Sequence, residues 1–237
     1  MMKSVIAFTL FLLVFAGAAG AQQKTTSAEP EKPAAQNPKK TNARPVNNIK
    51  AALADPFDKA SVETMAAQCV KFETDAGNIE FEMFPESAPE SVRNFLNLVA
   101  TKSLDTTTFN RVVPGFIIQG GNLGTHEKYS HELAKRAART VPDEPSQIKH
   151  ERGILSMARA DTPNSATTNF FVLVGPATHL DGTFAAFGRV VNGMETVEAI
   201  NKAPVDGEKP KNPVRIKRAT ITACAKGEKA VSIVVNG

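Results

Sequence analysis

The sequence lacks tryptophan and contains a single tyrosine and only two cysteines among its 237 residues. Two cysteines exclude a disulfide-dense scaffold and a zinc site built from four thiolates. Four scattered histidines do not suggest a histidine-rich metal centre, so we expect no metal and no other cofactor. The 28 basic residues exceed the 24 acidic ones only slightly, whereas a protein that binds nucleic acid through phosphates usually carries a larger, clustered excess. A nucleic-acid partner is therefore not expected.

The N-terminus has the composition of a secretory signal peptide. Lys3 precedes an apolar run over residues 5–15, and small residues then lead to a cleavage site between Ala21 and Gln22. The alternative is a membrane anchor, but the run is shorter than the ~20 residues that span a bilayer. We expect residues 1–21 to be removed and the mature protein to be exported, without stable membrane insertion.

Residues 22–66 are rich in proline, alanine and lysine and poor in apolar residues, which predicts a flexible tether. Within it, residues 51–66 could form a short helix with Leu53, Phe57 and Met65 on one side. The tether is mildly basic in its charge. It is either a solvated spacer or a segment that touches an acidic envelope surface, and we favour the spacer.

Regular structure begins near Cys69. Apolar and polar residues alternate over 70–74 and 79–83 around a turn at 75–78, which predicts a β-hairpin. Further β-rich segments follow, and a second short helix is predicted over 194–201. The additional strands are expected within residues 109–121, 153–158, 169–174, 185–191 and 214–223.

A longer helix is predicted after Pro85. Ser87 could cap it, Pro89 suits the first turn, and Glu90 would complete a capping box. Apolar residues at the spacing of one helical face continue to residue 99, so one side of this helix should cover a sheet. Residues 127–139 could form another helix.

Two motifs and several shorter blocks carry a family resemblance. Residues 109–121 read Phe-Asn-Arg-Val-Val-Pro-Gly-Phe-Ile-Ile-Gln-Gly-Gly, and residues 153–158 read Gly-Ile-Leu-Ser-Met-Ala. The blocks Thr168-Asn169-Phe170-Phe171, Leu180-Asp181-Gly182 and Phe187-Gly188 follow in order. From about Val70 to Ala223 the chain resembles the cyclophilin family of peptidyl-prolyl cis-trans isomerases.

The resemblance implies a mainly β fold, a closed eight-stranded antiparallel barrel capped by two α-helices, spanning residues 67–226 and followed by a tail at 227–237. It implies an active site on the outer face of the barrel. With the signal peptide, the chain looks like an exported bacterial cyclophilin of the periplasm. Such a protein would be a monomer that accelerates folding by rotating X–Pro bonds in unfolded or extended polypeptides.

The resemblance also implies the roles of individual residues. Arg111 matches the catalytic arginine of the family, and Gln119 matches a glutamine that hydrogen-bonds the substrate backbone. The other matches would bind substrate, either as an apolar pocket for the proline ring or as the strip that holds the peptide. These residues are Phe109, Phe116, Met157, Ala158, Arg159, Asn169, Phe171, His179, Leu180 and Phe184.

Four positions depart from the family pattern. Asn110 and Phe184 stand where histidines are found, Asn169 replaces a glutamine, and His179 replaces the tryptophan of cyclosporin-sensitive members. We therefore keep open a non-catalytic alternative, a chaperone or proline-peptide binding module with the cyclophilin fold. The retention of Arg111 favours the interpretation as an enzyme over the non-catalytic alternative.

A serine hydrolase is not favoured. The sequence has no Gly-x-Ser-x-Gly elbow, and neither Ser156 nor Ser165 has an evident histidine partner.

The two cysteines could form a disulfide. In the resembling family the first and last strands are neighbours, and Cys69 opens the first while Cys224 closes the last. An exported protein favours such a bridge. The alternative is a pair of buried thiols or an unpaired redox cysteine.

Overall fold

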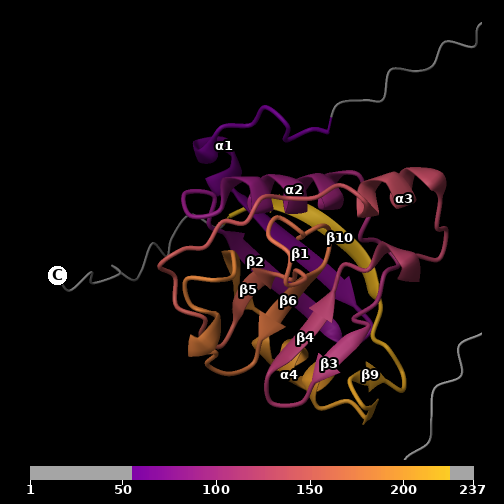
Figure 1. Ribbon diagram of the computed structural model, residues 1–237. Coiled ribbons are helices and arrows are strands. Elements are labelled where there is room, and N and C mark those ends of the chain that lie inside the picture. Colours follow the sequence, from indigo (N-terminus) through magenta and orange to yellow (C-terminus); the bar gives the residue numbers. More distant parts are fainter. Residues whose placement is uncertain (1–54, 225–237) are drawn as a thin grey trace, which may run out of the picture. The chain divides into compact units, whose positions relative to one another are not determined.

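The computed structural model describes residues 55–224, so the expected signal peptide, the tether up to residue 54 and the C-terminal tail lie outside the described part. Eight antiparallel strands form one curved sheet in the order β10-β1-β2-β7-β5-β6-β4-β3 (Figure 1). The strands are β1 (Gln68–Thr74), β2 (Gly77–Met83), β3 (Arg111–Val113), β4 (Ile117–Gly120), β5 (Ile154–Met157), β6 (Phe170–Leu173), β7 (Ala186–Asn192) and β10 (Ile216–Ala223).

The two edge strands, β3 and β10, are not joined by a ladder of hydrogen bonds. The prediction of a closed barrel is therefore wrong, although the eight antiparallel strands are present. An isolated bridge between Thr108 and Arg215, with a few neighbouring backbone hydrogen bonds, connects the chain just before each strand. Pro213 has no N–H to extend this pairing. The N–H of Val112 in β3 donates instead to the carbonyl of Glu208, at 2.8 Å.

Glu208 belongs to a small hairpin that sequence analysis did not predict. Its strands are β8 (Val205–Asp206) and β9 (Lys209–Pro210), and Gly207 turns between them with φ of +60°. A left-handed φ is favourable for glycine because it has no Cβ. The hairpin thus covers the free edge of β3.

Side chains alternate between the two faces of the sheet, and each face has its own apolar cluster. The inner cluster is the larger core, in which Phe72, Phe95 and Phe170 pack with ring centroids 5.3 to 6.0 Å apart. The second cluster lies on the outer face of β4, β5 and β6 and is called here the outer cluster. Its buried members are Ile117, Ile154, Phe171, Leu173, Ala177, Leu180 and Ala186.

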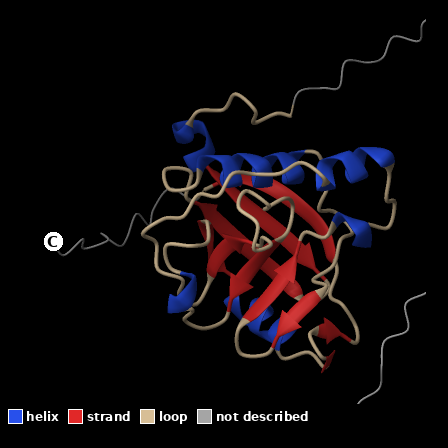
Figure 2. Ribbon diagram, in the orientation of Figure 1, coloured by secondary structure: helices blue, strands red, loops and turns tan. Residues whose placement is uncertain are grey.

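Within residues 55–224, four α-helices accompany the sheet, and Figure 2 shows where the helices lie around it. The two predicted cap helices are α2 (Pro89–Ala100), which packs against β10 and β7, and α4 (Met194–Asn201), which packs against β2, β3 and β4. Helix α3 (His131–Ala137) is shorter than expected. None of the helices in residues 55–224 is long and apolar enough to cross a membrane.

Part of the expected tether belongs to the fold. Helix α1 (Val62–Ala66) lies within the predicted 51–66 segment, and its Met65 is completely buried. Phe57 packs against the inner core, and its N–H donates to the Asn97 side chain of α2 at 2.8 Å. Leu53 lies outside the described residues.

The start of α2 differs from the predicted cap. Ala88, not Ser87, is the N-cap residue, and no side chain of its own caps the helix. The Glu144 carboxylate, 54 residues away, accepts hydrogen bonds from the N–H groups of Glu90 and Ser91, both at 2.8 Å, and from the Ser91 hydroxyl at 2.7 Å. The prediction of a capping box is therefore wrong. A distant acidic side chain, instead of Ser87, binds the free N–H groups of the first turn.

The Glu144→Ala variant is therefore expected to be less stable by about 1–2 kcal/mol, the usual cost of losing a helix cap. Urea unfolding followed by circular dichroism measures this difference. Glu86→Gln is the matched control, because it removes an exposed negative charge near the same helix end without breaking a cap. Equal stability losses in the two variants would contradict the specific capping role.

The structure joins Cys69 and Cys224 in a disulfide with a Cα–Cα distance of 4.9 Å. Cys69 lies in β1 opposite Thr222 of β10, and the N–H of Cys224 donates to the Ala67 carbonyl at 3.2 Å. The bridge thus joins the start of β1 to the end of β10, which are neighbours in the sheet and its first and last strands along the chain.

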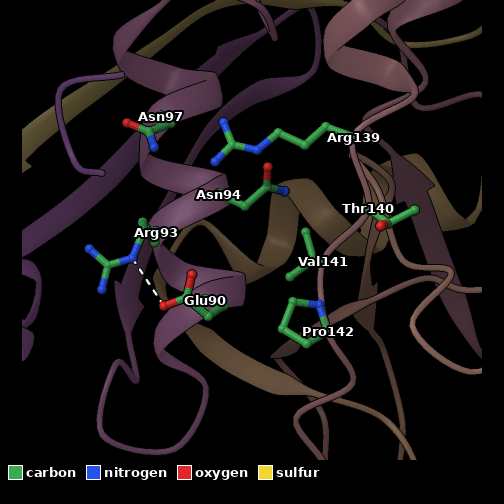
Figure 3. A pocket seen from close by; sticks show the side chains of 8 residues that line it. All are labelled: Glu90, Arg93, Asn94, Asn97, Arg139, Thr140, Val141 and Pro142. Carbon is green, nitrogen blue, oxygen red and sulfur yellow. Dashed lines mark hydrogen bonds and ion pairs between the residues drawn. The ribbon is translucent and has the colours of Figure 1, made fainter. Parts of the chain in front are cut away.

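A hollow of about 40 Å³ lies between α2 and the segment that follows α3 (Figure 3). Arg93 and Arg139 are among its lining residues, and Arg93 also pairs with Glu90 at 3.2 Å. No residue that lines it belongs to the predicted substrate site. This hollow is therefore distinct from the predicted substrate site.

Candidate active site

The candidate site begins with a row of side chains that crosses neighbouring strands. Arg111 of β3 pairs in register with Gln119 of β4, and Gln119 pairs with Phe171 of β6. Directly opposite residues on adjacent strands point to the same face. The register therefore places the predicted catalytic arginine, the predicted glutamine and one predicted pocket residue side by side on the outer face.

The Arg111 guanidinium has two protein partners. Its Nη1 donates to Oε1 of Gln119 at 3.0 Å. Its Nε and Nη2 donate to the two carboxylate oxygens of Glu208, at 2.6 and 3.2 Å. These hydrogen bonds hold the pKa of the Glu208 carboxyl below its usual range. The arginine side chain keeps 41% of its surface exposed, so it can still meet a ligand.

The outer cluster lies beside this row and collects most of the predicted pocket. Phe171 and Leu180 are buried members, while Phe116, Ala158 and Phe184 are partly buried against them. The Phe171 and Phe184 rings pack edge to face, with centroids 6.1 Å apart. An apolar surface of this kind next to arginine and glutamine donors can bind an apolar ring beside a peptide group.

Two predicted site residues lie elsewhere. Met157 is next to Ser156 in β5 and therefore points to the inner face, where it belongs to the core. Phe109, which precedes β3, is also fully buried in the inner core and packs edge to face on Phe170. The structure therefore places both side chains away from the outer face on which the candidate site lies.

Sequence reasoning missed Ile117. It lies two residues before Gln119 in β4, so it shares the outer face, and it is a buried member of the outer cluster. Strand alternation counted from Gln119 would have found it.

Arg159 holds one wall of the cluster. Its guanidinium carbon lies 4.9 Å from the centroid of the Phe184 ring, within cation–π range. It also donates to the carbonyls of Ala160 and Thr183, at 3.0 and 3.4 Å, and lies 3.9 Å from Asp143. Arg159 therefore contacts Phe184, one of the four departures from the family pattern.

The other three departures from the family pattern are His179, Asn169 and Asn110. His179 is exposed, with its ring centroid 5.7 Å from that of Phe116. The carbonyl of Asn169 accepts the N–H of Ala158 at 3.0 Å, so this N–H is used by the fold. Asn110 Oδ1 is buried without a hydrogen-bond partner in residues 55–224.

Ser156, contrary to expectation, has a histidine partner. Its hydroxyl lies 3.1 Å from Nε2 of His150, whose Nδ1 lies 3.3 Å from Asp181. The serine and histidine are only 0 and 1% exposed, however. A nucleophile that no substrate can reach does not support a hydrolase.

Burial lowers the pKa of His150, and the hydrogen bond and charge of Asp181 only partly oppose this effect. The unfolded chain, with a histidine pKa of about 6.5, then binds more protons than the folded one, so this contribution to stability is lost as pH falls below about 6.5. We expect the wild-type melting temperature to fall more steeply between pH 7.5 and 5.5 than that of His150→Gln. Parallel curves would contradict this origin.

Similarity to known proteins identifies the class of this protein. The family model described as cyclophilin type peptidyl-prolyl cis-trans isomerase/CLD matches residues 69–221. The chain therefore belongs to this family and is an isomerase of this class.

Individual relatives agree with the family assignment. A peptidyl-prolyl cis-trans isomerase of Acinetobacter baylyi is 36% identical over 66% of this chain and 86% of its own length. The isomerase CYP23 of Arabidopsis thaliana is 39% identical over 59% of this chain, and the match spans only 62% of the plant protein. A crystal structure of a Cryptosporidium parvum cyclophilin type isomerase has a TM-score of 0.58 and 33% identity, covering 66% of this chain and 98% of its own.

The described residues contain no group of three or more histidine, cysteine, aspartate or glutamate side chains placed to hold a metal ion.

Proposed function

We propose that this protein accelerates the folding of exported proteins by rotating their X–Pro bonds at the outer cluster. The observation that carries the site is the alignment of Arg111, Gln119 and Phe171 in one cross-strand row beside the apolar residues. A Cryptosporidium parvum relative was crystallised in the presence of the dipeptide Ala-Pro, which supports a proline-containing ligand. The protein would act as a monomer on unfolded or extended segments.

Rotation of an X–Pro bond makes and breaks no covalent bond, but it must cross a barrier of roughly 18–20 kcal/mol because amide resonance is lost. A catalyst need only bind the twisted state more tightly than either planar state. In the twisted state the prolyl nitrogen gains a lone pair, and a fixed charged donor such as Arg111 stabilises it. The apolar cluster would hold the proline ring, and Gln119 would bind the peptide backbone.

Isomerisation of an Ala-Pro peptide, followed by NMR exchange, tests the enzymatic proposal. We expect exchange cross-peaks to grow in the presence of catalytic amounts of protein. Binding of the same peptide without faster exchange would favour the alternative, a chaperone or binding module. The substitutions at Asn110, Asn169, His179 and Phe184 motivate that alternative.

Export to the periplasm is supported by the N-terminal composition alone. Cell fractionation and N-terminal sequencing of the mature protein test it. We expect a chain that begins at Gln22 in the periplasmic fraction, whereas a cytoplasmic chain that retains Met1 would contradict export.

Inhibition by cyclosporin is expected to be weak. His179 offers neither the broad ring nor the indole N–H of the tryptophan found in sensitive members of the family. The His179→Trp variant should bind cyclosporin more tightly, and titration in the isomerase assay measures the change. Nanomolar inhibition of the unmodified protein would contradict the alignment of this residue.

A further inference from the structure

We propose that Glu208 is a positioning residue for isomerisation, because it fixes the Arg111 guanidinium in the orientation that a substrate meets. The inference rests on the proposed catalytic role of Arg111. Glu208 binds the arginine through two hydrogen bonds, at 2.6 and 3.2 Å, along one side of the guanidinium. Two parallel bonds fix a planar group in orientation as well as in place.

Glu208 is itself anchored to the strand that carries the arginine. Its carbonyl accepts the N–H of Val112, the residue after Arg111, at 2.8 Å. The β8–β9 hairpin holds it from the other side, through the turn at Gly207. The carboxylate and the guanidinium therefore start from backbone segments that are bonded to each other, which limits the positions that either side chain can take.

The hydrogen bonds of the guanidinium show which of its N–H groups remain for a substrate. Arginine has five N–H groups. Two donate to Glu208 and one to Gln119, so one N–H on Nη1 and one on Nη2 remain. Without Glu208, a side chain that is 41% exposed would keep only the Gln119 contact.

The carboxylate also has an opposing effect, because its negative charge weakens the field of the arginine. Glu208 is 54% exposed, and the interaction of exposed charges is small and screened by water and salt. Misplacement of a catalytic group by about 1 Å can cost on the order of a hundredfold. We therefore expect the loss of orientation to dominate.

The experiment compares kcat and KM for an Ala-Pro peptide among wild type, Glu208→Ala and Glu208→Gln. We expect Glu208→Ala to lower kcat by roughly tenfold with little change in KM, since the arginine would be misplaced and the apolar cluster left intact. Glu208→Gln keeps one oxygen acceptor and should lose less. Asp206→Asn is the matched control, because it removes the same charge from an exposed position of the same hairpin and should leave kcat unchanged.

Combining Glu208→Ala with Arg111→Ala separates this inference from the proposed site. If Glu208 acts through Arg111, its removal has no further effect once the arginine is gone. Full activity of Glu208→Ala alongside an inactive Arg111→Ala variant would overturn the positioning role and leave the proposed site standing. Full activity of Arg111→Ala would overturn the site itself. Melting curves of Glu208→Ala and Glu208→Gln that match wild type show that the hairpin is intact.

Discussion

The Arg111→Ala variant is expected to lose at least about a hundredfold in kcat/KM for X–Pro isomerisation while it keeps its fold, because one charged donor to the twisted amide is removed. The side chain is partly exposed and lies at the edge of the outer cluster, so its removal leaves the inner core untouched. NMR exchange with an Ala-Pro peptide measures the activity, and circular dichroism checks the fold.

Arg152→Ala is the matched control for this prediction. Arg152 is a second exposed arginine whose Nε and Nη2 both bind a glutamate, Glu198, at 3.0 and 2.6 Å. It lies outside the outer cluster, so its loss should leave kcat/KM near the wild-type value. A folded Arg111→Ala variant with nearly full activity would contradict the mechanism.

Loss of the disulfide is expected to have the largest effect on stability. The bridge closes a loop of 155 residues, and in the chain-entropy model such a loop stabilises the fold by about 5 kcal/mol. For a domain of this size each kcal/mol corresponds to roughly 2–4 °C, so reduction should lower the melting temperature by on the order of 10–20 °C.

The measurement compares melting curves with and without a reductant. The double variant Cys69→Ser/Cys224→Ser is the control, because its melting temperature should be low and should not respond to the reductant. Thiol counting under denaturing conditions, on protein from its native compartment, checks the bridge directly. Two free thiols would contradict it.

Local patterns in the sequence were sufficient for the elements with strong alternation or helical spacing. The α4 helix has the predicted extent, and the β1–β2 hairpin contains the predicted strands, each of which starts two residues earlier than expected. The residues of these elements themselves determine where they form. The cap of α2 could not be predicted in this way, since Glu144 reaches it from 54 residues away. The β8–β9 hairpin has only two residues in each strand, too few for a periodic pattern.

The candidate site was predictable only where local sequence motifs mark its residues. Arg111, Gln119 and Phe171 occur in motifs, and the register brings them together. Met157 also occurs in a motif, but its place beside Ser156 puts it on the opposite face from the site. The contacts of Glu208 with Arg111 and of Arg159 with Phe184 join distant segments, and no local pattern signals them.

The position of the disulfide has a mechanical consequence. If the domain is pulled by its two ends, the tension passes from Cys69 through the S–S bond to Cys224, and residues between them carry no load. Within the described part of the chain, only residues 55–68 could be drawn out before the covalent bond is reached. The sheet and the site on its outer face would then remain folded under forces that would unravel the reduced protein.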